Sequence, residues 1–194
     1  MDERRIPWAE GSWTHPPVAA VEEGDDLVVT AVEGSDAWRI TSYGFVHDDE
    51  HALLVPLPPD AAVEVTFTAG LDAQFDQAGL FLRLSDQHWI KAGAEFADGS
   101  LQVGVVATEG VSDWSAAPVP EWARRRVTIR ASRAGDAVTI RARVADEAWR
   151  FVRLVPLDPA LPAAAGPYLC APSRAGLTVR FHEWAVTAAD GSLH

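Results

Sequence analysis

The chain has 194 residues, of which 28 are acidic and 16 are basic, and its formal net charge is −12. This length is typical of one domain with a well-buried core, so we expect a single domain over residues 1–194. The acidic balance repels phosphate backbones and anionic lipid head groups, which argues against nucleic acids and membranes as partners.

Cysteine usage and hydropathy bear on the cellular compartment. Cys170 is the one cysteine, so the chain forms no internal disulfide and no cysteine-based zinc site. No run of about 18 apolar residues is present to cross a bilayer, and the first residues lack the apolar stretch of a secretion signal. These features predict a cytoplasmic protein, and no cofactor is expected.

The order of segments along the chain predicts an all-β fold. Residues 1–17 contain Trp8, Trp13 and four breakers, which indicates an irregular lead-in whose tryptophans pack on the body. Beyond them, short alternating or β-branched segments recur between turn residues, as is typical of strands. These segments are residues 27–32, 38–45, 52–57, 62–69, the two halves of 75–96, 101–108, 124–131, 137–144, 149–154, 166–171 and 177–186. Almost no stretch has a helical period, so an antiparallel two-sheet sandwich is favoured, and a single closed barrel would show the same alternation.

The stretch of residues 75–96 is the centre of this pattern. It reads as two alternating strands joined at residues 85–87, with one apolar face and one mixed face. The mixed face carries five large polar or aromatic side chains, namely Gln77, Arg83, Trp89, Lys91 and Glu95.

These five residue types are the parts of a sugar site. An aromatic plate stacks on C–H faces, and amide, ammonium and carboxylate groups bond hydroxyls. Gly79 and Gly93 would leave room on the same face for a ligand or for a neighbouring backbone. The alternative is that Lys91 and Glu95 merely form salt bridges on a solvated sheet.

Other positions extend the candidate site. Trp114 lies in an expected polar loop, where it either contacts ligand at the rim or covers the core. Tyr168 is a further binding candidate, whereas Cys170 reads as a small buried hydrophobe, because no histidine is spaced to activate it as a nucleophile. Some of four arginines would favour an acidic sugar if they faced the groove: Arg150, Arg153, Arg174 and Arg180.

One cluster has metal-ligand chemistry. His47, Asp48, Asp49 and His51 fall within five residues and could meet one divalent ion. The spacing matches no specific metal motif, and an acidic turn between two strands explains the same residues. We therefore assign no metal site.

The sequence also resembles a known family. The segments that carry this resemblance are WRITSYGF at residues 38–45, DDEHALL at 48–54, QFDQAGLFLRLSDQHWIKAGAEF at 74–96, SDWS at 112–115 and GPYLCAPSRAGLTVRFHEW at 166–184. Together they are similar to the DUF1349 family, which resembles the concanavalin A-like lectin and glucanase superfamily. The resemblance implies a jelly roll of two curved antiparallel sheets, whose concave sheet holds sugars in related proteins.

The resemblance leaves the function open between three alternatives. The first is a domain that binds a small saccharide or sugar-like metabolite in the groove. The second is a carbohydrate-active hydrolase, lyase or isomerase using Glu95 and Lys91, although the Glu-x-Asp-x-x-Glu motif of superfamily glucanases is absent. A hydrolase would also need a second carboxylate, for which the sequence offers options such as Asp76, Asp86 and Asp113. The third is a regulatory protein-binding module, because a fungal relative is described as a regulator of enolase.

The spacing of Lys91 and Glu95 gives the most specific prediction. Four strand residues span about 13 Å, so these two groups cannot pair and each needs its own counter-charge, with Arg83 the candidate for Glu95. We expect Lys91 opposite Gln77 or Gly79, and a pocket that includes Lys91, Glu95 and Gln77 with Trp89 in its wall. We also expect Lys91→Met to weaken binding more than it lowers the melting temperature.

Overall fold

Two antiparallel sheets stack face to face, and apolar side chains from both fill the space between them. The computed structural model describes residues 3–193, and strands take up 60% of it against 3% for helices. The predicted all-β, two-sheet jelly-roll sandwich is therefore confirmed. The two separate sheets exclude the closed barrel, since each ends in its own edge strands.

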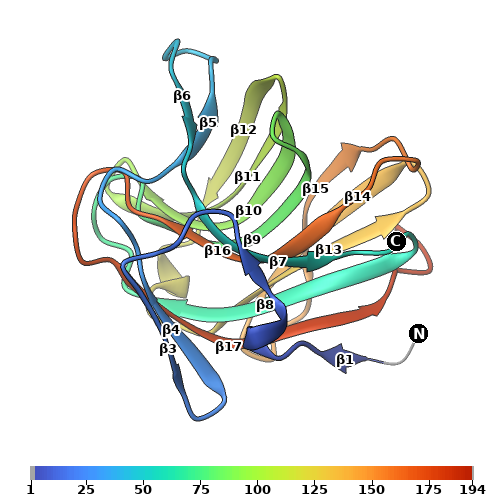
Figure 1. The fold of residues 1–194 in the computed structure, drawn as a ribbon, viewed down its shortest axis with the longest axis horizontal. Helices are drawn as coiled ribbons and strands as arrows, with labels where there is room; N and C mark the ends of the chain where they lie inside the picture. The colour runs from blue at the N-terminus through green and yellow to red at the C-terminus, as the bar shows by residue number, and fades with distance from the viewer. Residues whose placement is uncertain (1–2, 194) are drawn as a thin grey trace.

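In Figure 1 the larger sheet runs along the bottom and up the right side, and the smaller sheet lies above its lower part. The larger sheet contains, in spatial order, β15 (Arg150–Pro156), β14 (Ala137–Val144), β13 (Val127–Ala134), β8 (Ala61–Ala69), β17 (Thr178–Ala188), β4 (Asp26–Thr30) and β3 (Ala19–Glu23), with β1 (Arg4–Arg5) paired to β17. The smaller sheet contains β12 (Val111–Pro118), β11 (Ser100–Glu109), β10 (His88–Ala97), β9 (Gln77–Ser85), β16 (Ala164–Cys170), β7 (His51–Pro56) and β2 (Ser12–Trp13). Two short 3₁₀ helices, η1 (Trp8–Glu10) and η2 (Pro120–Trp122), complete the body. Among the described residues, no helix has the length and apolarity that crossing a bilayer requires.

Buried and half-buried side chains alternate along strands that face the core. In β14, every second residue from Val138 to Val144 is buried and the others are half-buried. The largest fully buried side chains are Trp122, Trp184 and Phe67. Burying each such side chain stabilises the fold by about 1.5–3 kcal/mol relative to leaving it in water.

The N-terminal lead-in packs on this core, as its tryptophans predict. The ring of Trp8 stacks on Trp184 with centroids 6.3 Å apart. The indole N–H of Trp8 donates to the carbonyl oxygen of Asp25 at 3.0 Å. Trp13 is half-buried against the same cluster.

The predicted strand over residues 38–45 is wrong. The chain forms a hairpin there, made of β5 (Ala37–Arg39) and β6 (Val46–Asp48), which projects from the body beside β12 in Figure 1. Ile40 and Ser42 have positive φ angles of 65° and 62°, which reverse the chain and which β-branched residues such as isoleucine rarely adopt. Residues 40–45 are therefore the connection of a hairpin.

The predicted loop at Asp113–Ser115 is also wrong, because these residues belong to β12. β12 is an edge strand, and most of its side chains are exposed, so the apolar alternation that marks a buried strand is missing. The exposed strand β3 lacks the alternation for the same reason and was not predicted.

A second, smaller apolar cluster covers the outer face of the smaller sheet. Its buried members are Ala37, Ala52, Leu54, Phe81, Trp89, Val106, Tyr168 and Cys170. Ala37 comes from β5, so the β5–β6 hairpin lies over this face and shields part of it from water. The face of the β9–β10 hairpin that was predicted to be mixed is therefore partly buried in this apolar cluster.

Candidate functional site

A β-bulge near the start of β10 sets the register of the β9–β10 hairpin. With this extra residue, Phe81 lies opposite Lys91, and Gln77 lies opposite Glu95. Side chains alternate between faces, so without the bulge Lys91 and Glu95 would sit opposite core-facing residues of β9. The predicted backbone pairing of Lys91 with Gln77 or Gly79 is wrong, because Lys91 lies further towards the turn.

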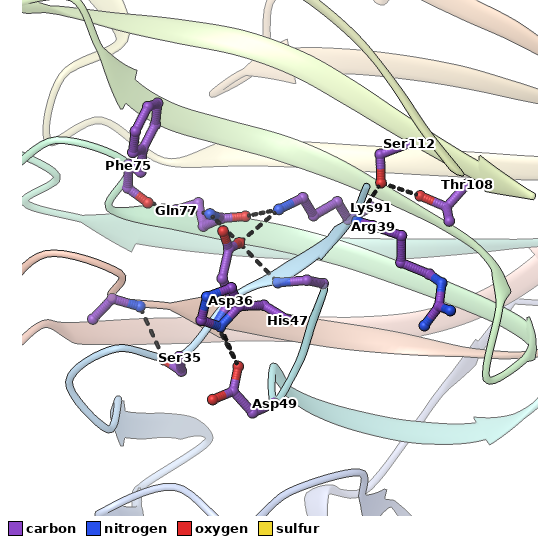
Figure 2. A network of polar contacts seen from close by, with 12 residues as sticks. Ser35, Asp36, Arg39, His47, Asp49, Phe75, Gln77, Lys91, Thr108 and Ser112 are labelled. Atoms are coloured by element: carbon purple, nitrogen blue, oxygen red, sulfur yellow. Dashed lines mark hydrogen bonds and ion pairs between the residues drawn. The ribbon is translucent and has the colours of Figure 1, made fainter. Parts of the chain in front are cut away.

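Lys91 nevertheless reaches Gln77 with its side chain. Its Nζ donates to Gln77 Oε1 at 2.7 Å and to Asp36 Oδ1 at 3.0 Å. Gln77 Nε2 in turn donates to Asp36 Oδ1 at 3.1 Å and to the carbonyl oxygen of Phe75 at 3.2 Å. Figure 2 shows these groups converging on the Asp36 carboxylate. One oxygen of Asp36 thus joins β9 and β10 to the segment that enters β5.

Burial and charge together fix the protonation of Lys91. Its side chain is 4% exposed, and this burial alone would lower the pKa of the ammonium group. Attraction to nearby acidic groups, chiefly Asp36, outweighs burial and raises the pKa above its usual value. Lys91 is therefore a fixed cation and not a neutral nucleophile.

Glu95 has a different environment on the same strand face. Among residues 3–193, no side chain or backbone group forms a hydrogen bond or ion pair with its carboxylate. Burial raises the pKa of Glu95 to about 7; attraction to Lys91 lowers it, and repulsion from Asp36 adds to the rise. The prediction that Glu95 finds its own counter-charge in Arg83 is wrong, because Arg83 pairs with Asp86 beside the turn.

The β5–β6 hairpin is held over the sheet by polar contacts. The backbone N–H of Arg39 donates to Ser112 Oγ at 2.9 Å, and Ser112 Oγ lies 2.8 Å from Thr108 Oγ1. Where the chain enters β5, the backbone N–H of Asp36 donates to Asp49 Oδ1 at 2.9 Å. Figure 2 shows these bonds: the first ties the hairpin to β12, the second joins β12 to β11, and the third joins the two ends of the hairpin.

Aromatic side chains from the hairpin line up in a row. Trp38 and Tyr43 meet edge to face with ring centroids 5.7 Å apart, and Tyr43 stacks on Phe45 at 5.2 Å. Phe45 then meets the His47 ring at 4.9 Å. Tyr43 is 56% exposed and Phe45 is 42% exposed, so their faces remain open to solvent.

The hairpin row and the sheet face enclose a cavity of about 280 Å³, which we call the aromatic cavity. Its lining has four charged or titratable residues, Asp36, His47, Lys91 and Glu95, together with Gln77. The remaining lining residues are aromatic or small: Gly34, Trp38, Tyr43, Phe45, Phe75, Val106, Trp114 and Pro172. The cavity thus has a polar floor and aromatic walls.

The structure brings four of the predicted site residues into this cavity, namely Gln77, Lys91, Glu95 and Trp114. Trp89 does not line it, because it is 3% exposed and stacks on Phe81 with centroids 5.4 Å apart. The predicted Trp89 wall is therefore wrong, and Trp114 with the hairpin aromatics forms the wall. Tyr168 is buried in the same small cluster as Trp89.

Several lining residues were missed by sequence reasoning. Trp38, Tyr43 and Phe45 stood in a segment interpreted as an ordinary strand, although aromatic residues beside Ser and Gly are a usable signal for a binding loop. The residues next to Asp36 in the sequence form no motif that marks it as a site residue. Asp36 lies 41 residues from Gln77 and 55 from Lys91 in sequence, so only the fold brings it to them.

The other candidates lie elsewhere. Each of the four arginines is paired with acidic groups outside the aromatic cavity: Arg150 with Glu121 and Glu147, Arg153 with Asp113, Arg174 with Asp72 and Asp76, and Arg180 with Glu23 and Asp26. Asp76, Asp86 and Asp113, the predicted second carboxylates, are therefore engaged in ion pairs, and none of the three lines the aromatic cavity. Burial raises the pKa of the Cys170 thiol well above its usual value, which leaves it protonated.

The histidine and aspartate cluster is not assembled around one point. His51 is buried, and its two ring nitrogens lie 3.0 Å from the backbone N–H of Val32 and 3.0 Å from the carbonyl oxygen of His15. His47 Nδ1 lies 3.6 Å from Asp49 Oδ1. Over residues 3–193, no three His, Cys, Asp or Glu side chains are grouped to hold a metal ion.

Comparisons with known proteins agree with this architecture. The chain is 33% identical to the protein named "Regulation of enolase protein 1" of Saccharomyces cerevisiae, over 100% of this chain and 98% of that protein. A solved structure of a functionally unknown protein from Saccharomyces cerevisiae superposes with a TM-score of 0.90 at 33% identity, covering 96% of this chain and 100% of the other.

More distant structures share the fold alone. A xylan β-1,4-xylosidase from Bacillus halodurans superposes with a TM-score of 0.66 at 13% identity, over 84% of this chain but only 32% of the xylosidase. The family model described as "Protein of unknown function (DUF1349)" matches residues 13–189. With this match over most of its length, the chain belongs to the DUF1349 family, as the sequence resemblance predicted.

Proposed function

We propose that the aromatic cavity binds a small saccharide or a sugar-like metabolite. The observation that carries this proposal is the combination of a polar floor, formed by Lys91, Gln77 and Asp36, with aromatic walls around it. Aromatic faces stack on the C–H faces of sugars, and convergent polar groups orient hydroxyls.

The size of the cavity sets the size of the ligand. Its volume of about 280 Å³ is just below the roughly 300–1,000 Å³ typical of ligand pockets. A monosaccharide or a short saccharide end fits this space better than a long polymer chain does. The open faces of Tyr43 and Trp114 stand at the solvent side, where a longer ligand would leave the cavity.

A saccharide panel tests this proposal. Thermal melting is followed with neutral, amino and acidic monosaccharides and disaccharides for the wild-type protein and for Trp114→Ala. Phe151→Ala is the matched control, because Phe151 is also an exposed aromatic on a strand but does not line the cavity. We expect a sugar that raises the melting temperature of wild type and control but not of Trp114→Ala. A panel without any response, or an undiminished response of Trp114→Ala, contradicts the proposal.

Glu95 favours a second candidate, a carbohydrate-active enzyme. A carboxyl group with a pKa of about 7 is suited to act as a general acid near neutral pH, and Asp36 supplies a second carboxylate in the same cavity. Turnover of aryl glycosides and reducing sugars, followed by NMR, tests this candidate. It requires activity in the wild-type protein that Glu95→Gln removes; binding without turnover leaves the domain a binding module.

The name of the yeast relative favours a third candidate, regulation through contact with enolase. The β5–β6 hairpin exposes Ile40, Tyr43, Phe45 and Val46, and exposed apolar groups of this kind anchor protein interfaces. Sedimentation of the purified protein with purified enolase tests the contact. Co-sedimentation that Tyr43→Ser abolishes supports it, and independent sedimentation contradicts it.

A further inference from the structure

We propose that the ligand of the aromatic cavity carries a positively charged amine, which the Glu95 carboxylate and the surrounding aromatic faces hold. This assignment rests on the cavity being the ligand site proposed above, and it names the chemical class of the ligand. An amino sugar is the simplest molecule that satisfies both statements.

The ammonium group of Lys91 in the cavity is already paired with other side chains. The ammonium group of Lys91 is 4% exposed and is bonded to Asp36 and Gln77 at 3.0 and 2.7 Å. It therefore neutralises Asp36 and offers little to an incoming anion. Among the residues that the structure describes, no arginine lines the cavity. An acidic sugar would find no free guanidinium or ammonium group there.

The carboxylate of Glu95 lacks a hydrogen-bond or ion-pair partner among the described residues. It lines the cavity, and none of the residues 3–193 forms a hydrogen bond or ion pair with it. Because the side chain is half-buried at the cavity, its carboxylate takes its hydrogen-bond donors from water there or from a ligand. With Lys91 and Asp36 paired to each other, Glu95 leaves the cavity with an uncompensated acceptor that suits a cationic donor.

The walls of the cavity are rich in aromatic side chains. Five aromatic side chains line the cavity, namely Trp38, Tyr43, Phe45, Phe75 and Trp114. The negative face of an aromatic ring attracts a cation, and sites for organic ammonium groups combine several such rings. The formal charge of −12 on the whole chain adds a negative potential that favours cations over anions.

Isothermal titration with four matched probes tests the inference: glucosamine, glucose, N-acetylglucosamine and glucuronic acid. Glucosamine differs from glucose by its ammonium group, and acetylation removes that charge while it keeps the ring. We expect the wild-type protein to bind glucosamine roughly tenfold more tightly than either neutral sugar, and glucuronic acid most weakly, as one charge-assisted hydrogen bond predicts.

A charge-matched pair of variants locates the effect. Glu95→Gln keeps the shape of the side chain but removes the charge, and we expect it to bind glucosamine no more tightly than glucose. Glu22→Gln makes the same change of net charge in the exposed strand β3, away from the cavity, and is expected to keep the wild-type preference. Retention of the preference by Glu95→Gln overturns the assignment of Glu95.

The outcomes separate this inference from the proposed function. Equal affinity for glucosamine, glucose and N-acetylglucosamine supports saccharide binding but overturns the amine. Choline serves as a fifth probe, since it has the cation without the sugar ring. Binding of choline alone, lost in Glu95→Gln, supports the amine and contradicts saccharide binding. No heat with any of the five probes at millimolar concentration contradicts both.

Discussion

Lys91 on β10 and Asp36 at the entry to β5 form an ion pair in which Nζ and Oδ1 are 3.0 Å apart. The exposed fractions of the two side chains are 4% and 17%, so the pair lies mostly out of water. It joins the hairpin that covers the sheet to the sheet itself. The contact that shapes the floor of the aromatic cavity is thus also a contact that holds the fold together.

Lys91→Met is expected to lower the free energy of unfolding by about 3–5 kcal/mol, because it leaves the mostly buried Asp36 charge without a counter-charge. The sequence alone predicted that this substitution weakens binding far more than it lowers the melting temperature, and the buried pair adds a large expected loss of stability. Urea unfolding of Lys91→Met, Asp36→Asn and the double variant measures it. The double variant should recover part of the loss. A single variant as stable as the wild-type protein would show that the pair contributes nothing.

Glu95 is expected to make stability depend on pH. Its pKa is about 7 in the folded chain against 4.5 for an ordinary glutamate, so between these values the folded state binds more protons than the unfolded state. Stability contributed by Glu95 is therefore present below about pH 4.5 and is lost as pH rises through 7. At about 1.4 kcal/mol per pH unit, the loss is at most on the order of 3 kcal/mol.

Urea unfolding at pH 5 and pH 8 checks this prediction. Glu95→Gln cannot ionise, so it should be more stable than the wild-type protein at pH 8, and this advantage should shrink at pH 5. Glu22→Gln, on an exposed strand, serves as the control and should follow the wild type at both values. An advantage of Glu95→Gln that does not change with pH would contradict the raised pKa.

The two tryptophans predicted as site residues should separate in their effects. Trp89 is 3% exposed and packed on Phe81, so Trp89→Ala should cost about 3–5 kcal/mol of unfolding free energy. Trp114 is 38% exposed, and Trp114→Ala should change that free energy by less than about 1 kcal/mol. Chemical denaturation of both variants measures the difference, and equal losses would refute the distinction.

Gly93 should not tolerate a side chain. A Cβ atom there would lie 2.1 Å from the carbonyl oxygen of Ala78 on β9, a contact that only a backbone shift can relieve. We expect Gly93→Ala to lower the free energy of unfolding by about 1–3 kcal/mol or more. Gly70→Ala is the matched control, since nothing lies within 4 Å of its Cβ position. Similar melting temperatures for the two variants would contradict the close approach.

The strands were predictable where burial is one-sided. β14 alternates in sequence because one of its faces packs on the core, and the predicted segment 137–144 matches its bounds. β3 and β12 are exposed, so their sequences carry no such alternation. Apolar–polar alternation in the sequence indicates that one strand face is buried, so a strand that buries few side chains shows little alternation.

The site was only half predictable for a related reason. Gln77, Lys91 and Glu95 lie on adjacent strands, so their common face follows from the two-residue period. Asp36 comes from a distant segment, and its arrival depends on a hairpin that turns at Ile40 with φ of 65°. Trp89 was wrongly expected in the cavity wall because alternation gives the face of a side chain and not what covers that face.

Lys91 is the one lysine in the sequence, and the fold encloses its side chain beneath the β5–β6 hairpin. The folded surface described here therefore presents no ε-amino group. Acylating and reductive-methylating reagents, which modify many sites on most proteins, have a single such target in this one, and its 4% exposure predicts slow modification while the hairpin covers it. The rate of modification at Lys91 is therefore expected to rise when that hairpin lifts from the sheet.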